Sequence, residues 1–217
     1  ELRTPLNVIL SVLQLLSYLD KNDKASEEKN KHYMDVIKKS SNSLLNIIND
    51  IIDSSKIESG AYKINKEENI DIVYLVEETA LTLKDYITSK GIDLIIDPQI
   101  EEKMINCDPY ELERCIINLV SNAAKFTPEG GSITVDIEDL DDKVKISVID
   151  TGTGIDKKFH KSIFDRFSQV EDSEPVKSGS GLGLTITSQI IKLHKGKIYV
   201  ESELGKGSTF VIILPVN

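Results

Sequence analysis

The sequence of 217 residues has no tryptophan, three histidines and two cysteines. Two cysteines cannot build a disulfide framework, and Cys107 and Cys115 lack the spacing of metal ligands. Cys115 lies in an apolar helical run, so we expect a buried thiol there. No run of about 18 apolar residues occurs that would span a membrane. The chain opens at Glu1 without a signal-peptide pattern or an initiator methionine, so we expect a piece of a longer protein.

An excess of basic residues is also lacking, because 36 acidic residues outnumber 26 basic ones and give a formal net charge of -10. Nucleic-acid binders and proteins that bind anionic membranes carry the opposite sign. The charge therefore argues against nucleic acid and against direct membrane contact, although a local basic pocket for an anionic ligand is compatible with it. We expect a cytoplasmic fragment, with the cytoplasmic part of a membrane-anchored sensor as one form it can take.

The first 60 residues contain two helical patterns, over residues 1–20 and 26–59. Apolar side chains recur at steps of three and four along both, and Gly60 is a typical helix stop. A short polar connector makes the pair an antiparallel hairpin. One hairpin cannot cover both apolar seams, so pairing into a four-helix bundle predicts a homodimer through residues 1–60. The alternative is a hairpin that packs on its own C-terminal domain.

Residues 61–217 mix short alternating runs with helical patterns. We expect strands at residues 62–65, 92–96, 103–107, 132–138, 143–150, 197–201 and 209–214, and helices at residues 71–90, 108–126, 157–163 and 185–194. Asp108 can cap the second of these helices, and Pro109 suits its first position. The pattern predicts an α+β protein: an α/β sandwich with a mixed sheet and helices on one face.

A glycine-rich stretch, Gly179-Ser-Gly181-Leu182-Gly183-Leu184, runs directly into the last of these helices. Glycine lets a backbone approach a ligand closely, and a helix N-terminus offers unpaired N–H groups to phosphate. Glycines before a helix are also common as plain turn punctuation. Three other stretches of the sequence also suit nucleotide binding, and they favour the interpretation as a phosphate site.

Asn118 and Asn122 lie four residues apart on the helix of residues 108–126, and Lys125 and Phe126 follow at its end. An amide oxygen suits Mg²⁺, an ammonium group suits phosphate, and an aromatic ring can cover a base. Two asparagines on a wet helix face are an equally good interpretation of the spacing alone.

Asp150 ends an alternating run and is followed by Gly152 and Gly154. A carboxylate in this place can accept a hydrogen bond from an exocyclic amine such as that of adenine, and a capped turn is the alternative. Phe164 and Phe167 flank Arg166, which can reach a phosphate. Core aromatics beside a surface arginine would give the same pattern.

Together these stretches resemble the ATP-binding domain of sensor histidine kinases. Four family boxes match in order: Asn118-Leu-Val-Ser-Asn122-Ala-Ala-Lys125-Phe126, Asp150-Thr-Gly152-Thr-Gly154, Phe164-Asp-Arg166-Phe167 and the glycine stretch from Gly179 to Leu184. Gly205-Lys-Gly-Ser-Thr-Phe210 resembles the family's closing hairpin. Glu1-Leu-Arg-Thr4-Pro-Leu resembles the segment after the phosphorylated histidine, a motif that the related gyrases, mismatch-repair ATPases and heat-shock chaperones lack.

The resemblance implies a division into a dimerisation and histidine-phosphotransfer hairpin, residues 1–60, and a catalytic ATP-binding domain, residues 61–217. It implies Mg²⁺ at Asn122 with Asn118 nearby, adenine at Asp150 and Phe126, and a glycine turn at Gly152 and Gly154. The implied phosphate-binding groups are Lys125, Arg166 and the backbone from Gly179 through Gly181, Leu182, Gly183 and Leu184.

The resemblance further implies phosphoryl transfer to a histidine directly ahead of Glu1, a position that this sequence does not contain. His32, His160 and His194 do not replace it, and His194 is expected to be a structural cap. Glu1 would orient the imidazole, and Thr4 would place water when the partner is dephosphorylated. That partner would be the receiver domain of a response regulator. Two alternatives are an ATP-driven conformational clamp and a non-enzymatic dimerisation module.

Overall fold

The computed structural model describes residues 2–18, 24–166, 168 and 181–216. The chain divides into two compact units, Glu1–Ala61 and Tyr62–Asn217. Within the described ranges, no helix is both long enough and apolar enough to cross a bilayer.

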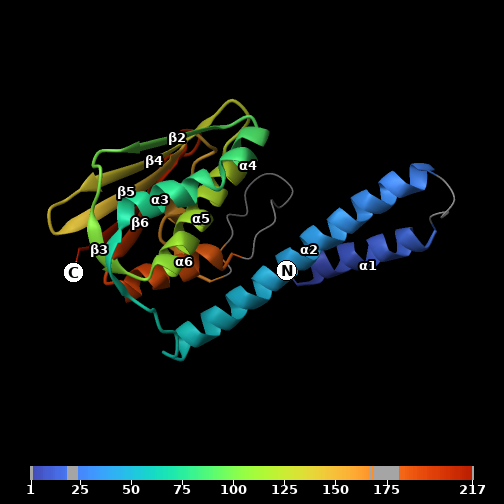
Figure 1. Cartoon of the computed structure of the whole chain (residues 1–217), viewed down its shortest axis with the longest axis horizontal. Coiled ribbons are helices and arrows are strands. Elements are labelled where there is room, and N and C mark those ends of the chain that lie inside the picture. The colour runs from blue at the N-terminus through green and yellow to red at the C-terminus, as the bar shows by residue number, and fades with distance from the viewer. Residues whose placement is uncertain (1, 19–23, 167, 169–180, 217) are drawn as a thin grey trace. The chain divides into compact units, whose positions relative to one another are not determined.

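The first unit is a helical hairpin built from α1 (Arg3–Ser17) and α2 (Lys24–Glu58), which appear in blue and cyan in Figure 1. Helix α2 begins two residues ahead of Ser26, so the expected start at Ser26 is wrong. Pro5 lies in the first turn of α1, where its missing N–H group would have no partner inside the helix, and the helix therefore runs on unbroken to Ser17.

The second unit is built on a five-stranded sheet in the order β2-β4-β5-β7-β6. Strands β2 (Asp93–Pro98) and β4 (Ser132–Asp139) are parallel, whereas β5 (Lys143–Asp150), β7 (Ser208–Pro215) and β6 (Lys197–Ser202) continue the sheet in antiparallel pairs. A small separate sheet pairs β1 (Glu67–Asp71) with β3 (Met104–Cys107). The mixed sheet confirms the expected fold class.

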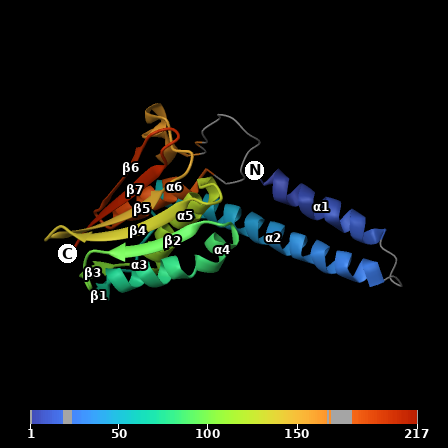
Figure 2. The ribbon, with the colours of Figure 1, turned by 90° about the horizontal axis from the view of Figure 1, so that it is seen from above.

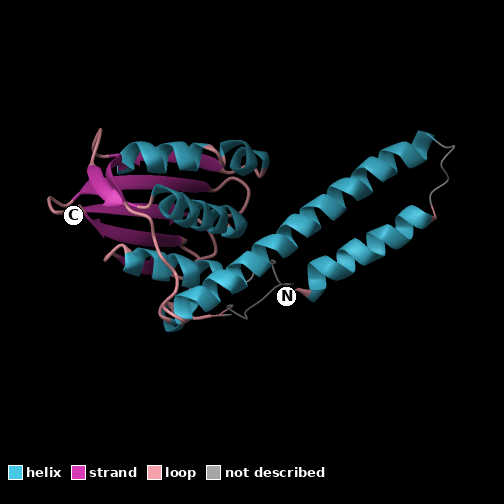
Figure 3. Ribbon diagram, turned by 60° about the horizontal axis from the view of Figure 1, so that its bottom comes forward, coloured by secondary structure: helices cyan, strands magenta, loops and turns pink. Residues whose placement is uncertain are grey.

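Helices α3 (Ile72–Leu81), α5 (Pro109–Phe126) and α6 (Gly183–Leu193) cover one face of the large sheet (Figures 2 and 3). Alternation along the strands explains this layering, because every second side chain points to the same face. On β5, Val144, Ile146 and Val148 are at most 1% exposed. The core of the unit therefore lies between the sheet and its helices.

Three local expectations for this unit are wrong. Residues 62–65 form no strand, and the strand of that region is β1 instead. The expected helix over residues 71–90 is divided into α3 and α4 (Lys84–Ser89). The expected helix over residues 157–163 is replaced by two single 3₁₀ turns, η1 (Lys157–Phe159) and η2 (Ser162–Phe164), a form of helix that proteins use in short pieces.

Helix α5 begins as the sequence predicts. The side chain of Asp108 accepts a hydrogen bond from the backbone N–H of Glu111, and Pro109 occupies the first turn. His194, which follows α6, accepts the backbone N–H of Asp108 on Nε2 at 2.9 Å. A backbone N–H can only donate, so Nε2 is unprotonated and Nδ1 donates to the carbonyl oxygen of Ile190 at 2.9 Å. This neutral ring joins the end of α6 to the start of α5, and burial lowers its pKa.

Candidate functional site

The two asparagines of the predicted site lie on one stripe of α5 together with Cys115. Positions 115, 118 and 122 are separated by steps of three and four, so they face the same neighbour, which is α6. The Nδ2 atom of Asn118 donates to Oγ1 of Thr187 at 2.9 Å, and Nδ2 of Asn122 lies 3.5 Å from Oδ1 of Asn118. No described residue donates a hydrogen bond to Oδ1 of Asn122, which leaves that oxygen available.

The start of α6 lies against the same amide. A Cβ atom on Gly183, the first residue of the helix, would lie 2.5 Å from Oδ1 of Asn118. Only glycine fits here without moving the asparagine. Gly181 has φ of 59°, in the left-handed region, and Leu182 is buried. Gly181 to Leu184 are therefore beside the asparagine stripe, whereas Gly179 lies outside the described residues.

Asp150 lies at the end of β5 and is only 6% exposed. Its Oδ1 accepts the backbone N–H groups of Gly152 at 2.8 Å and Ser208 at 3.2 Å. Its Oδ2 accepts no hydrogen bond from any described residue. Burial raises the pKa of this carboxyl, and the two N–H donors oppose the shift without cancelling it. One oxygen is thus fixed by the backbone, and the other is left to accept from a ligand.

The loop after Asp150 is held by close backbone contacts. A Cβ atom on Gly152 would lie 2.6 Å from the carbonyl oxygen of Phe126, at the end of α5. Gly154 has φ of 68°, and a side chain there would collide with the carbonyl oxygen of Glu203. The N–H of Gly205 donates to the carbonyl oxygen of Thr153 at 2.7 Å. The β6–β7 turn therefore contacts this loop on the side opposite to α5 and holds it in place.

Lys125 and Phe126 form the C-terminal end of α5. Phe126 is 41% exposed, so part of its ring is open to contact from outside the fold. The Nζ atom of Lys125 lies 4.9 Å from the centre of the Phe126 ring. An apolar ring and a cation thus lie at the end of the asparagine helix, next to the Asp150 loop.

The phenylalanine box begins at η2. The ring of Phe164 packs edge-on against Phe210 of β7, with 6.5 Å between the ring centres. This contact anchors the start of the segment to the sheet. Arg166 is half-buried, whereas Phe167 and residues 169–180 lie outside the described residues. In the first unit, Thr4 lies exposed on α1, and Glu1 lies outside the described residues.

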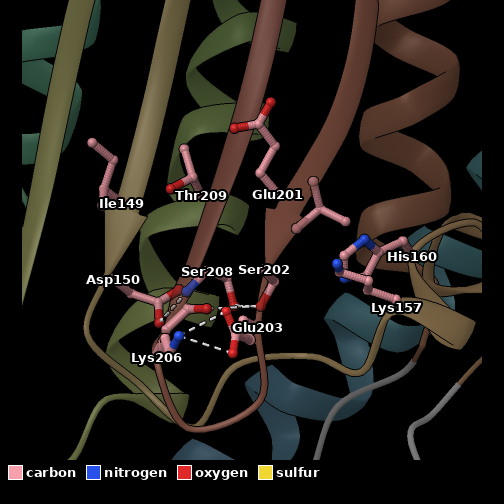
Figure 4. A pocket seen from close by; sticks show the side chains of 12 residues that line it. Ile149, Asp150, Lys157, His160, Glu201, Ser202, Glu203, Lys206, Ser208 and Thr209 are labelled. Carbon is pink, nitrogen blue, oxygen red and sulfur yellow. Dashed lines mark hydrogen bonds and ion pairs between the residues drawn. The ribbon is translucent and has the colours of Figure 1, made fainter.

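A separate hollow of about 500 Å³ lies at the ends of β5, β6 and β7 (Figure 4). Ile149, Thr209 and Glu201 project into it from three strands, and His160 and Lys157 approach from the η1 segment. Asp150 borders it, but Asn118 and Asn122 do not. This hollow therefore shares Asp150 and Ser208 with the predicted site but not its asparagine helix.

Two contributors to the site were not anticipated from the sequence. The N–H of Ser208 holds Asp150, and the hydroxyl of Thr187 holds Asn118, although neither residue was among the site candidates. A signal for Thr187 was present: α6 carries three hydroxyl residues close together, Thr185, Thr187 and Ser188, and all three are buried. Buried hydroxyl groups need partners, so such a face indicates a polar neighbour.

Comparison with known proteins covers both units. The model of the family described as histidine kinase-, DNA gyrase B- and HSP90-like ATPase matches residues 107–217, and the His Kinase A (phospho-acceptor) domain matches residues 1–60. The autoinducer 2 sensor kinase/phosphatase LuxQ of Vibrio parahaemolyticus is 37% identical over the whole chain, and the sensor protein EvgS of Escherichia coli is 34% identical. The chain spans 25% of LuxQ and 18% of EvgS.

Solved structures share the fold. Full-length ShkA in complex with AMPPNP is 28% identical, with a TM-score of 0.76, over 98% of this chain and 43% of ShkA. The nucleotide-free catalytic domain of the histidine kinase ThkA is 29% identical, with a TM-score of 0.63, over 70% of this chain and 97% of that domain. The structural similarity to ShkA therefore extends over both units, whereas the similarity to the ThkA catalytic domain covers a part of the chain about as long as the second unit.

Proposed function

The chain belongs to the two-component sensor histidine kinases, and from that premise we propose that it transfers the γ-phosphoryl group of ATP to a histidine directly ahead of Glu1 in the complete protein. The phosphoryl group would then pass to an aspartate of a response-regulator receiver domain. We assign the phosphotransfer role to residues 1–60, which the phospho-acceptor family model matches, and ATP binding to residues 61–217, of which the ATPase family model matches residues 107–217.

The observation that carries this proposal is the packing of Gly183 on Asn118. It brings the start of the glycine-led helix within contact distance of the asparagine stripe, although 65 positions separate the two residues in the sequence. Unpaired N–H groups at a helix start attract phosphate, and amide oxygens attract a hard cation. The two groups needed to hold a triphosphate with its metal are thus adjacent.

The remaining candidates fit the parts of ATP. The available Oδ2 of Asp150 can accept the exocyclic amine of adenine, and the exposed ring of Phe126 can lie against the base. Gly152 and Gly154 shape the loop beside it. Lys125, Arg166 and the backbone of Gly181, Leu182, Gly183 and Leu184, with Gly179 ahead of them, would hold the phosphates. Phosphoryl transfer needs mainly such positioning and charge neutralisation.

The donor set fits Mg²⁺ rather than a softer metal. Among the described residues, no three His, Cys, Asp or Glu side chains gather to hold a metal. The oxygen atoms of Asn122 and, beside it, Asn118 are hard ligands of the kind that Mg²⁺ takes together with water and phosphate. When bound, the ion would neutralise charge on the phosphates.

The hairpin would supply the acceptor side. Glu1 would accept a hydrogen bond from one imidazole nitrogen and leave the other free to attack phosphorus. Thr4, exposed on α1, would lie about one turn beyond the histidine and place a water molecule for dephosphorylation of the partner. Phosphatase activity is supported by the name of the relative LuxQ, a sensor kinase/phosphatase.

We further propose that the protein is a homodimer through residues 1–60 and acts in the cytoplasm. The support for the dimer is the exposure of large apolar side chains along both helices of the hairpin, including Leu10 at 51%, Leu45 at 56% and Ile52 at 46%. Apolar stripes of this size mark a surface that another chain covers.

The test is phosphorylation from γ-labelled ATP by the chain extended at its N-terminus with the histidine. We expect a label that is labile to acid and stable to alkali, as for a phosphohistidine. Asn122→Ala should remove nearly all of the label, whereas Asn69→Ala, a change of the same residue type in the β1 strand, should not. An acid-stable label, or full activity of Asn122→Ala, would contradict the assignment.

A further inference from the structure

Thr187 is a buried residue of α6 that none of the family boxes contains. It is 2% exposed and faces α5, where its Oγ1 accepts a hydrogen bond from Nδ2 of Asn118 at 2.9 Å. The bond joins two helices across 69 positions of sequence. Its partner is a candidate metal neighbour, so the hydroxyl group lies directly behind the predicted nucleotide site.

The direction of this bond follows from the two atoms that it joins. Nδ2 of Asn118 belongs to an amide NH₂ group, which can only donate, so Oγ1 of Thr187 is the acceptor. The NH₂ group of Asn118 therefore points to α6, and its Oδ1 points away from Thr187. Cys115, one turn before Asn118 on α5, lies on the same buried side of the helix.

The orientation of Asn118 then determines that of Asn122. With its NH₂ group turned to Thr187, Asn118 points Oδ1 toward Nδ2 of Asn122, at 3.5 Å, and toward the bare Cα of Gly183. Asn122 in turn presents Oδ1 on its other side, where no described residue donates to it. If the Asn118 amide were rotated by 180°, its NH₂ group would face the NH₂ group of Asn122. That contact would favour the same rotation of the Asn122 amide.

We propose that Thr187 is a positioning residue for the metal: through the Asn118 amide it keeps Oδ1 of Asn122 directed at Mg²⁺. The inference rests on the proposed function and adds to it a residue that acts through another side chain rather than on the nucleotide. Residues that orient metal ligands from behind typically change metal affinity about 10- to 100-fold when mutated.

A purely structural role for Thr187 would be packing between α5 and α6, and the chain offers a matched control for it. Thr185 lies two residues earlier on the same helix, is 7% exposed, and its Oγ1 has no hydrogen-bond partner among the described residues. Thr185→Val and Thr187→Val are thus the same change at two buried sites of α6. Only the second removes a hydrogen bond to the asparagine stripe.

The experiment measures binding of a fluorescent, non-hydrolysable adenine nucleotide to the full chain while Mg²⁺ is titrated. We expect Thr187→Val to raise the half-maximal Mg²⁺ concentration about tenfold. Nucleotide binding in excess chelator should stay unchanged, because the variant keeps Asp150 and the glycines. Thr187→Ser, which retains the hydroxyl group, should titrate within about twofold of the parent chain, as should Thr185→Val. A parent-like Mg²⁺ titration of Thr187→Val would overturn the inference, as would equal weakening by both valine variants.

A second pair covers the case in which Thr187→Val does not fold. Thr187→Ser and Thr187→Ala have both lost the γ-methyl group and differ only in the hydroxyl, so the inference requires the alanine variant alone to need more Mg²⁺. The side-chain NH₂ signal of Asn118 in nucleotide-free protein gives a readout without metal. Its hydrogen exchange should accelerate in Thr187→Val and Thr187→Ala but not in Thr187→Ser, and equal exchange in all three would overturn the inference.

The outcomes separate this inference from the proposed function. If the parent chain binds the nucleotide with Mg²⁺ and Asn122→Ala abolishes the metal dependence, the proposed function stands whatever Thr187 does. If Asn122→Ala retains the metal dependence of the parent chain, the assignment of the metal site itself is wrong.

Discussion

The two units differ in how far they bury their apolar side chains. In residues 62–217, side chains such as Ile72, Val120 and Ile190 are fully buried between the sheet and its helices. In the described part of the hairpin, Val12 is the one apolar side chain that is buried, although both helices are rich in leucine and isoleucine. The second unit therefore completes its own core, and the first does not.

This difference separates two sources of stability. Burial of apolar surface contributes about 25 cal/mol per Å², and the second unit obtains it within one chain. The hairpin gains it fully only when a second surface covers its stripe. Its stability is then tied to protein concentration, whereas that of the catalytic unit is not.

The sharpest test of the comparison is one substitution made in both units. Ile146→Ala, at a side chain that is 1% exposed on β5, should lower the free energy of unfolding of the second unit by about 2–5 kcal/mol. Ile52→Ala, at 46% exposure on α2, should change it by less than about 0.5 kcal/mol and instead weaken dimerisation. Urea unfolding and sedimentation would measure the two effects. Equal losses of stability would contradict the contrast.

Within the second unit, the charge of Asp150 is expected to have opposite effects on stability and on nucleotide binding. Its pKa is raised in the folded state, so its contribution to stability is present below the unfolded value of 3.8 and is lost as the pH rises through the folded value. Asp150→Asn keeps an oxygen for Gly152 and Ser208 and removes the buried charge. At pH 7 the variant should be at least as stable as the parent, while its affinity for adenine nucleotides falls by about 1.5–3 kcal/mol.

Calorimetry with and without nucleotide would show both effects of Asp150→Asn. Asp97→Asn, which removes the same charge from an exposed position on β2, is the control and should alter neither quantity. A less stable variant with unchanged nucleotide affinity would contradict the role of the free oxygen.

His194 predicts a dependence on acid that is confined to the second unit. Its pKa is lowered by burial, so the unfolded chain takes up a proton first as the pH falls below about 6.5. Stability should therefore decline from pH 6.5 down to the folded pKa, by at most about 1.4 kcal/mol per pH unit for this one group. Thermal unfolding between pH 7.5 and 5.5 would show it, and His194→Gln should flatten the slope. An unchanged slope in the variant would assign the effect to other groups.

The smallest effect is expected from the exposed face of the sheet. Lys145 and Glu138 form an ion pair of 2.7 Å between side chains that are 27% and 36% exposed. Glu138→Gln should lower the free energy of unfolding by less than about 1 kcal/mol. Sodium chloride at about 0.5 M should reduce the difference further, because salt screens exposed pairs. If Glu138→Gln lowered the free energy of unfolding as much as Ile146→Ala does, the Lys145–Glu138 pair would contribute far more to stability than an exposed ion pair should.

Much of this architecture could be predicted from local pattern. The start of α5 at Asp108 and Pro109 and the alternation along β5 depend on signals within a few residues, and each appears where it is expected. The single helix expected over residues 71–90 was also predicted from local pattern, and it is wrong. Helical periodicity continues through the junction of α3 and α4 and therefore does not reveal the break. Periodicity gives the type of an element more securely than its limits.

The sequence by itself determined which side chains this protein has for its chemistry: two asparagines one turn apart, an aspartate before glycines, and a glycine turn leading into a helix. Only the tertiary structure decided that Thr187 meets Asn118, that His194 meets Asp108 across 86 positions, and that the backbone of Ser208 donates to one oxygen of Asp150 while no described residue donates to the other. The physical reason is that spacing along a chain encodes which face of an element a residue occupies, whereas the packing of whole elements sets which faces meet.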